Sequence, residues 1–377
     1  MRILFIAKYS PKSSRLWGGE IHIIKLAEEL AKKNVKIFFI NSDYTGIINN
    51  VQYIKLPYKK YRKTPYNAEF NHLIRIIKKL KIDIINTFST NGVLIKKLKK
   101  KLNIPIIHSQ FVWRLDVSYK IRYPFAFLLY GKPFIYLAYL FELKGLNNAD
   151  YVIVTSRVLK KFVKYYTSQK NVQVIPRGVD IDLFKPSPYP NSNNIIAITL
   201  GRLDKAKGVQ DIIKAFKILK NKKINIKLLI FGVGPYLNSL KKLTKKYDLD
   251  EIIKFYGTIP HKLVPKVLKN SHFLISASWF EGFGGVLLEE MACSRPFITT
   301  KNGGSADIIK ENINGLSVKI KSPRDMADKI EYLAKNHSKA EIMGINGRKI
   351  VEKQFNWKNE ANSYLKFYKK VLKNSNK

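Results

Sequence analysis

The sequence contains 377 residues, of which 46% are hydrophobic and 12% are aromatic. A chain of this length favours two domains, and its apolar content is sufficient for large cores, which excludes a mainly disordered protein. The single cysteine, Cys293, excludes an intrachain disulfide and a zinc cluster built on thiolates. We therefore expect a cytoplasmic protein.

The formal net charge of +42 is the strongest compositional signal. Three explanations compete: binding to nucleic acid, binding to an anionic membrane surface, or the lysine-rich codon usage of an AT-rich genome. With only 27 acidic residues, the ion-pair networks of a hyperthermophile are disfavoured. Under each of the three explanations, the surface attracts phosphate groups.

The first half of the chain alternates short apolar runs with amphipathic segments. Residues 2–7 (RILFIA) have the pattern of a buried strand, and residues 20–33 that of a helix with one apolar face. Further strands are predicted at VKIFFI (35–40), VQYIKL (51–56), IDIINTF (82–88), IPIIHS (104–109), YVIVTS (151–156) and VQVI (172–175). Strands that are apolar throughout are typical of a parallel sheet covered by helices on both faces.

One segment of the first half has a second interpretation. Residues 119–144 are rich in tyrosine and phenylalanine and carry basic residues, but Lys132 and two prolines interrupt them. Buried helices, or a helix lying in a membrane interface, both fit this composition better than a membrane-spanning helix. We expect this segment to make peripheral contact with an anionic membrane.

Residues 185–194 (KPSPYPNSNN) have the composition of a linker, and the alternation of strands and helices resumes after them. Strands are predicted within residues 195–203, 226–234, 252–258, 272–278, 296–300 and 315–318. We therefore predict two Rossmann-like, doubly wound domains facing across a cleft, with ligands bound beyond the carboxyl ends of the strands. The first domain comprises residues 1–180 together with a C-terminal crossing helix at 358–377. The linker comprises residues 181–194, and the second domain comprises residues 195–357.

The segment GRLDKAKG (201–208) directly follows a predicted strand. Arg202 can bind a phosphate through its planar fork, and Lys207 adds a second cation. Gly208 precedes a helix whose first amides face the same place. A charged loop without a ligand is the alternative in so lysine-rich a chain.

The segment FEGFGGVLLEEMAC (280–293) also joins a strand to a helix. Gly282, Gly284 and Gly285 allow backbone amides to approach a diphosphate at the helix N-terminus. Glu289 lies one turn beyond Gly285, where its carboxylate can accept hydrogen bonds from a vicinal diol. Glu290 is rotated by about 100° from Glu289, and we expect it to be a solvated partner of lysine.

These two segments resemble motifs of the retaining family-4 glycosyltransferases, which have the GT-B fold. EGFGGVLLE is similar to that family's pair of glutamates with seven residues between them, and GRLDKAKG to its phosphate-binding loop. The resemblance extends to WGGE (17–20), VIPRGVDIDLF (174–184), ENINGLSV (311–318) and QFNW (354–357), in the expected order.

The resemblance implies roles for individual residues. Arg202 and Lys207 would bind the diphosphate, Glu289 the ribose, and Glu281 with the amides from Phe283 to Gly285 the transferred sugar. His108 would face the sugar from the first domain. Gly18 and Gly19 would bring amides against the phosphate. The nucleobase would lie beside residues 255–259, at Gly257, Thr258 and Ile259.

The sequence departs from the family at several positions. Ser109 stands where Asp is frequent, Arg177 where Asn is usual, and Gly285 where a bulkier apolar residue is usual. Residues 302–309 lack the family's proline and glutamate. The motif DID (180–182) is similar to a metal-binding DxD, but we interpret it as structural, because the family needs no metal.

The leading hypothesis is therefore a metal-independent retaining glycosyltransferase that moves a hexose from a UDP- or GDP-linked sugar to a saccharide or lipid-linked acceptor. No cofactor is expected. A basic nucleic-acid-binding protein, and a GT-B phosphorylase or sugar-nucleotide epimerase, are the alternatives. The nucleic-acid alternative predicts basic and aromatic residues on one face, rather than a cationic loop opposite a glycine-rich helix start.

Overall fold

The computed structural model describes residues 1–7, 18–41, 43–56, 67–88, 92–110, 142–192 and 194–375. The chain forms two compact units, one of Met1–Pro176 with Trp357–Lys377 and one of Arg177–Asn356. Residues 181–194, predicted as a linker, belong to the second unit, and Trp357 belongs to the first. Most of the aromatic segment 119–144 lies outside the described residues.

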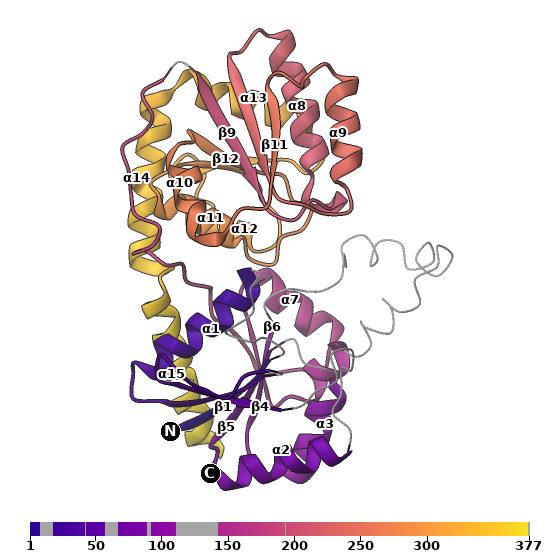
Figure 1. Cartoon of the computed structure of the whole chain (residues 1–377), viewed down its shortest axis with the longest axis vertical. Coiled ribbons are helices and arrows are strands. Elements are labelled where there is room, and N and C mark those ends of the chain that lie inside the picture. Colours follow the sequence, from indigo (N-terminus) through magenta and orange to yellow (C-terminus); the bar gives the residue numbers. More distant parts are fainter. Residues whose placement is uncertain are drawn as a thin grey trace, which may run out of the picture. The chain divides into compact units, whose positions relative to one another are not determined.

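Among the described residues, the first unit contains an eight-stranded sheet of order β3-β4-β2-β1-β5-β6-β7-β8. Figure 1 labels β1, β4, β5 and β6 of this sheet. Its strands run parallel except for β3, which pairs antiparallel with β4. The strand bounds are β1 Arg2–Ile6, β2 Lys36–Asn41, β3 Gly46–Ile48, β4 Val51–Lys55, β5 Ile84–Phe88, β6 Ile106–Gln110, β7 Tyr151–Val154 and β8 Val172–Val174.

Strand β3 was not predicted from the sequence. It forms a hairpin with β4 through Asn49 and Asn50, whose φ angles are 48° and 63°. Two successive residues with positive φ are typical of the tight hairpin turn that matches strand twist, and asparagine tolerates this conformation. The Asn-Asn pair between apolar runs was the available signal.

The helices of the first unit that the structure describes are α1 (Gly18–Ala31), α2 (Asn67–Lys79), α3 (Gly92–Lys101), α7 (Arg157–Tyr166) and α15 (Trp357–Ser375). The C-terminal helix α15 packs against α1 and buries Ala361, Tyr364 and Tyr368 in the same core as Phe5 of β1. Strands β5 and β6 are buried along their whole length, as expected for a sheet covered on both faces.

The second unit contains a parallel six-stranded sheet of order β11-β10-β9-β12-β13-β14. Its strands are β9 Ile195–Leu200, β10 Ile226–Phe231, β11 Ile253–Gly257, β12 Phe273–Ser276, β13 Phe297–Thr300 and β14 Gly315–Val318. Its helices are α8 Val209–Asn221, α9 Leu237–Lys246, α10 Val264–Lys269, α11 Gly285–Ala292, α12 Ser305–Ile308, α13 Pro323–Lys335 and α14 His337–Gln354, with 3-10 turns η1 Lys205–Lys207 and η2 His261–Leu263.

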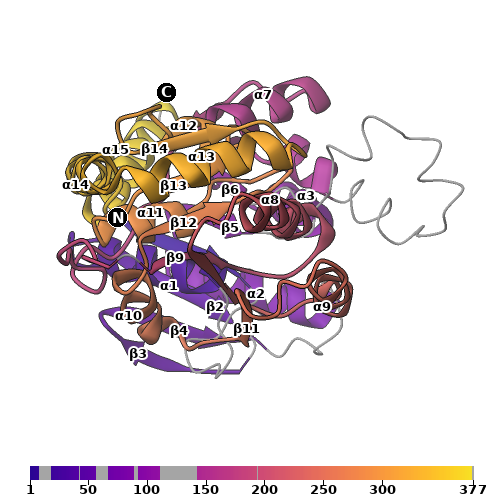
Figure 2. The same ribbon diagram turned by 90° about the horizontal axis from the view of Figure 1, so that it is seen from above.

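Helices α8 and α13 lie side by side, and α11 packs against α14 (Figure 2). The prediction of two α/β units with doubly wound parallel sheets is confirmed, apart from the antiparallel edge strand β3. Strands β9 and β12 are neighbours and parallel, so the loops that follow them leave the sheet at the same edge. This arrangement places GRLDKAKG beside FEGFGG.

The segment predicted as a linker is held against the second unit by the fully buried side chain of Arg295. Its guanidinium donates to the carbonyl oxygens of Ser187 at 2.9 Å and Pro188 at 2.6 Å, and to the Ser187 hydroxyl at 2.9 Å. It also donates to the carbonyl oxygens of Lys269 and Ser271. The proline-rich composition therefore marks an ordered connection.

Across the described part of the chain, every helix falls short of the length or hydropathy that crossing a bilayer requires.

Candidate functional site

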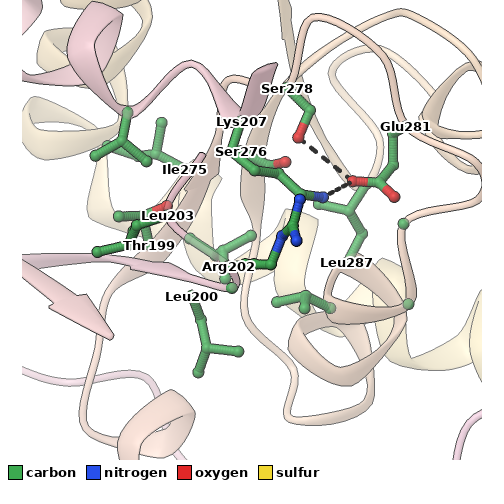
Figure 3. A pocket seen from close by; sticks show the side chains of 16 residues that line it. Thr199, Leu200, Arg202, Leu203, Lys207, Ile275, Ser276, Ser278, Glu281 and Leu287 are labelled. Atoms are coloured by element: carbon green, nitrogen blue, oxygen red, sulfur yellow. Dashed lines mark hydrogen bonds and ion pairs between the residues drawn. The ribbon is translucent and has the colours of Figure 1, made fainter. Parts of the chain in front are cut away.

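A pocket in the second unit lies at the carboxyl ends of β9 and β12 and at the first turn of α11 (Figure 3). Its lining includes the predicted Arg202, Lys207, Glu281, Gly284 and Gly285. The remaining lining residues are Thr199, Leu200, Gly201, Leu203, Val209, Leu274, Ile275, Ser276, Ser278, Val286 and Leu287. The structure thus brings together the charged residues of two motifs that are about seventy residues apart.

Gly208 allows the first loop to approach the exit of β12. Its φ angle is 68°, in the left-handed region, and a Cβ atom there would lie 2.0 Å from the carbonyl oxygen of Ala277. Any other residue would push the two loops apart. The backbone amide of Trp279 donates to the Ala206 carbonyl at 2.8 Å, and the Trp279 indole donates to Asp211 at 2.8 Å. The two loops are therefore joined on both sides of Gly208.

The side chains of Lys207 and Glu281 form an ion pair across the pocket. Lys207 Nζ lies 2.7 Å from Glu281 Oε2, and the Ser278 hydroxyl donates to the same oxygen at 3.3 Å (Figure 3). Burial alone raises the pKa of Glu281, but the Lys207 charge and the hydrogen bonds from Lys207 and Ser278 together outweigh it, and the pKa is lowered. Burial likewise opposes the charge of Lys207, and the Glu281 carboxylate raises its pKa. Both groups are therefore charged at neutral pH.

Arg202 extends into the same space as Lys207 and is largely exposed. Its Nε and Nη2 atoms lie 2.9 Å and 2.8 Å from Asp204 Oδ2, and its side chain is 62% exposed. An ion pair this exposed contributes little to stability. The guanidinium can therefore exchange or share this partner with an incoming anion at small cost.

Gly284 forms the start of α11. It has φ 96° and ψ 52°, so a residue with a side chain would be strained there. Gly303 and Gly304 pack beneath this loop: Cβ atoms on them would lie 2.0 Å from the Glu281 carbonyl oxygen and 2.3 Å from the Phe283 Cα. Phe283 is buried, with its ring 6.1 Å from that of Phe355. The glycines at 303 and 304 were not recognised from the sequence as supports of this loop.

Glu289 lies one turn into α11 and contacts a residue that sequence reasoning missed. Its Oε1 atom lies 3.1 Å from Nε2 of His261, in the turn η2. This hydrogen bond raises the pKa of His261 above its usual value, although burial opposes the shift. The His261 ring also packs edge-on against Phe184 at 5.5 Å. The position of His261 shortly after a strand, in a turn beside the motif helix, was the available signal.

The prediction that Glu290 is solvated is wrong. Glu290 belongs to α11, and its side chain is fully buried. Burial raises the pKa of Glu290 well above the usual value, and the nearby Arg295 charge opposes that rise. Glu290 does lie on a different face of the helix from Glu289, as helical geometry predicts. What that geometry could not reveal is that α11 packs against α14, where a Cβ atom on Gly347 would lie 3.1 Å from Cγ of Met291.

Comparison with known proteins identifies the family. The model of the Glycosyltransferase Family 4 matches residues 17–183, and the model of the glycosyl transferases group 1 matches residues 180–350. The chain belongs to the family-4 glycosyltransferases of the GT-B fold. The resemblance stated from the sequence motifs is thereby confirmed, and the protein is a glycosyltransferase.

Two curated relatives and one solved structure illustrate the similarity. The chain is 27% identical to an uncharacterized glycosyltransferase of Methanocaldococcus jannaschii, over 98% of each chain. It is 26% identical to the alpha-monoglucosyldiacylglycerol synthase of Streptococcus pneumoniae, over 84% of this chain and 74% of that one. It shares its fold with Anabaena HepE in complex with UDP and glucose, at a TM-score of 0.75 and 16% identity, over 98% of this chain and 100% of that one.

Two of this glycosyltransferase's predicted site regions lie in the first unit. Gly18 and Gly19 form the first residues of α1, and the space around the Cβ position of Gly19 is open. His108 was predicted at the exit of its strand, but it lies within β6, which continues to Gln110. Its Nδ1 lies 2.8 Å from the Thr87 hydroxyl and its Nε2 3.1 Å from Gln110 Oε1. Burial lowers the pKa of His108 to about 4, so the ring is neutral. The roles of these residues stay predictions.

The predicted nucleobase region of the glycosyltransferase follows β11. Gly257 has φ 70°, and its carbonyl oxygen accepts a hydrogen bond from the Gly232 amide at 2.6 Å. The nearby ring of Tyr256 stacks on Phe231 with centroids 5.1 Å apart. Among the described residues, those lining the pocket do not include Gly257, Thr258 or Ile259. Their contact with a base stays a prediction.

The DID motif takes part in a turn. The Asp180 carboxylate accepts hydrogen bonds from the amides of Asp182 at 3.1 Å and Leu183 at 2.9 Å. A side chain that accepts hydrogen bonds from the amides two and three residues further on stabilises its own turn. These contacts agree with the structural interpretation of the motif.

Proposed function

We propose that this glycosyltransferase transfers a hexose, with retention of configuration and without a metal ion, from a UDP- or GDP-linked sugar to a saccharide or lipid-linked acceptor. The observation that carries the proposal is the pocket in which Arg202 and Lys207 meet the first turn of α11. Two cations at a helix N-terminus with glycines in its first turn suit a diphosphate. Anabaena HepE, whose fold is similar, was crystallised with UDP and glucose.

The two carboxylates divide the remaining donor groups between them. Glu281, held by Lys207 and Ser278, would accept hydrogen bonds from hydroxyls of the transferred sugar. Glu289, one turn further along α11, would accept from the ribose hydroxyls. Its partner in the structure is His261, which would yield or share the carboxylate when the nucleotide binds.

The pocket favours front-face attack over a covalent glycosyl-enzyme. Glu281 is engaged by an ammonium and a hydroxyl, which reduces its nucleophilicity. In the proposed step the acceptor oxygen bonds to the anomeric carbon while the bond from that carbon to the phosphate oxygen breaks. The acceptor proton passes to the leaving phosphate. Arg202 and Lys207 stabilise the charge that develops on the diphosphate, in place of a divalent ion.

The net charge suggests where the acceptor lies. A strongly basic surface concentrates the protein at anionic membranes, and one relative is named for synthesis of a glycolipid. We propose peripheral attachment to an anionic leaflet and a lipid-linked or saccharide acceptor. Co-sedimentation with anionic vesicles at low salt is expected, and a protein that stays in the supernatant contradicts the attachment.

A thermal-shift screen against nucleoside diphosphates tests the donor class. A nucleotide that binds the folded state at a hundred times its Kd stabilises it by about 2.7 kcal/mol. We expect UDP or GDP to raise the Tm, and Arg202→Ala to reduce this shift and to lower turnover about 100-fold or more. Arg324→Ala, an exposed arginine on α13, is the matched control.

Four results would contradict parts of this proposal. Full turnover in the Arg202→Ala variant would contradict the role of the pocket in binding the donor diphosphate. Conversion of a labelled sugar nucleotide without acceptor favours an epimerase. Activity abolished by a chelator and restored by manganese contradicts metal independence. Tight, sequence-tolerant retention of nucleic acid at physiological salt, with no nucleotide response, favours the binding-protein alternative.

A further inference from the structure

Two of the sequence's departures from its family lie against one another in the second unit. Arg177 is the first residue of that unit, and Gly285 is the first residue of α11. The guanidinium atoms Nη1, Cζ and Nη2 of Arg177 lie 3.6, 3.7 and 3.9 Å from the position that a Cβ atom on Gly285 would occupy. A methyl group there would be in ordinary contact, whereas a branched side chain would need the space of the guanidinium.

The charges of the pocket explain what this arginine can add. Each of the two cations that line it has a carboxylate close by: Lys207 pairs with Glu281, and Arg202 with Asp204. These four side chains sum to zero, although the proposed ligand carries at least two negative charges. Arg177 brings a further positive charge to the start of α11, next to the lining residue Gly285.

The electrostatic influence of Arg177 reaches both sides of this region. Burial raises the pKa of Glu281, and the charges of Lys207 and, more weakly, Arg177 lower it. On the other side, the hydrogen bond to Glu289 raises the pKa of His261, and the charge of Arg177 opposes that rise. The guanidinium therefore lies within effective Coulomb range of groups at both ends of the proposed donor site.

We propose that Arg177 is a third cationic ligand of the donor diphosphate, binding oxygens of its terminal phosphate, and that Gly285 provides the space for it. The inference rests on the proposed function, because it assumes that a nucleoside diphosphate occupies the pocket. The planar fork of arginine suits two phosphate oxygens at once, and the first turn of α11 presents its amides to the same group. The two departures then form one feature: the glycine leaves the volume that the arginine fills.

The test compares nucleoside diphosphate with nucleoside monophosphate by isothermal titration calorimetry. The probes are UDP and UMP, or GDP and GMP if guanine nucleotides raise the Tm of the wild type. Arg177→Asn is expected to weaken diphosphate binding about tenfold, since a charge-assisted contact is lost, and to leave monophosphate binding within about twofold. The loss specific to the diphosphate is a readout that a general structural defect would not produce.

Variants at Gly285 test the same contact without altering the arginine. Gly285→Leu is expected to displace the guanidinium and to reproduce the diphosphate-specific loss. Arg324→Asn, the same change at an exposed arginine of α13, is the matched control and should bind both nucleotides as the wild type does. The double variant Arg177→Asn/Gly285→Leu should lose no more than either single variant, since both remove one contact.

The outcomes separate this inference from the function on which it rests. If the wild type binds neither diphosphate, both proposals fall. If the wild type prefers diphosphate, Arg202→Ala loses that preference, and Arg177→Asn and Gly285→Leu keep it, the pocket binds the donor and the role of Arg177 is refuted. If Arg177→Asn fails to fold, Gly285→Leu decides: a retained preference for diphosphate overturns the proposal.

Discussion

At the carboxyl edge of the second unit's sheet, Arg202 is largely exposed and bonds a single carboxylate, Asp204. At the amino edge of the same sheet, Arg295 is fully buried and donates to backbone carbonyls before β9, β12 and β13. The two edges therefore use one residue type in opposite ways. The first arginine has a charge that a ligand can reach, and the second satisfies carbonyl groups that water cannot reach.

Two glutamates of the second unit also differ in their surroundings, and this difference shifts their pKa values in opposite directions. Glu281 faces the pocket and is paired with Lys207, so its pKa is lowered despite burial. Glu290 lies on the buried face of α11 and has its pKa raised by that burial. A parallel sheet thus separates binding from stability, because its carboxyl edge carries the ligand loops and its amino edge is closed by packing. Three predictions test this separation.

Arg295→Met is expected to have the largest effect. It removes the donors for several buried carbonyls and should lower the free energy of unfolding by about 3–5 kcal/mol. The matched change at the other edge, Arg202→Met, should cost less than about 0.5 kcal/mol. Urea denaturation of both variants measures this. Equal losses in the two would show that the edges are not divided as described.

Glu290→Gln should have an intermediate effect that depends on pH. Because the folded-state pKa of Glu290 is raised, the folded protein binds more protons than the unfolded one, and stability falls as pH rises above about 4.5. The glutamine variant lacks this loss. It should be more stable than the wild type by about 1–2 kcal/mol at pH 8, with the difference vanishing near pH 4.

Thermal or urea unfolding at several pH values measures this difference. Glu281→Gln is the control from the carboxyl edge and should behave oppositely. Its wild-type carboxyl has a lowered pKa, which stabilises the fold above about pH 4.5, so the variant loses stability there. A Glu290→Gln variant with a pH-independent stability difference would contradict the account of that buried carboxyl.

His261→Asn should have the smallest effect on stability. The hydrogen bond to Glu289 raises the pKa of His261, so its contribution is fully present below pH 6.5 and is lost as pH rises through the folded-state pKa. The side chain is 31% exposed, which limits the loss in the variant to about 0.5 kcal/mol at pH 5.5. Unfolding at pH 5.5 and pH 9 measures it, and an equal loss at both would contradict the pairing.

The sequence was sufficient to predict the carboxyl edge and the sheets. Continuous apolar runs identify buried parallel strands, and polar residues directly after them, such as Arg202, must lie at the carboxyl edge of the sheet. The hairpin strand β3 was missed because it is short and only partly buried, with Asn49 and Asn50 as its local signal. His261 was missed because its partner Glu289 is twenty-eight residues away.

The amino edge could not be predicted in the same way. Helical periodicity gives the direction of Glu290 but not what covers that face, and the acceptors of Arg295 lie as far away as Ser187. The prolines of residues 185–194 indicate a break in regular structure, yet they do not reveal that an arginine fixes it. Tertiary contacts between distant segments decide these features.

Hydrogen–deuterium exchange with and without UDP or GDP tests the central claim most directly. We predict that saturating nucleotide slows exchange of amides within residues 201–209 and 281–289, at the carboxyl edge. Amides within residues 269–271 and 293–295, at the amino edge, should be unchanged. Protection confined to the amino edge, or none at the carboxyl edge with nucleotide in large excess, would contradict the assignment of the pocket as the donor site.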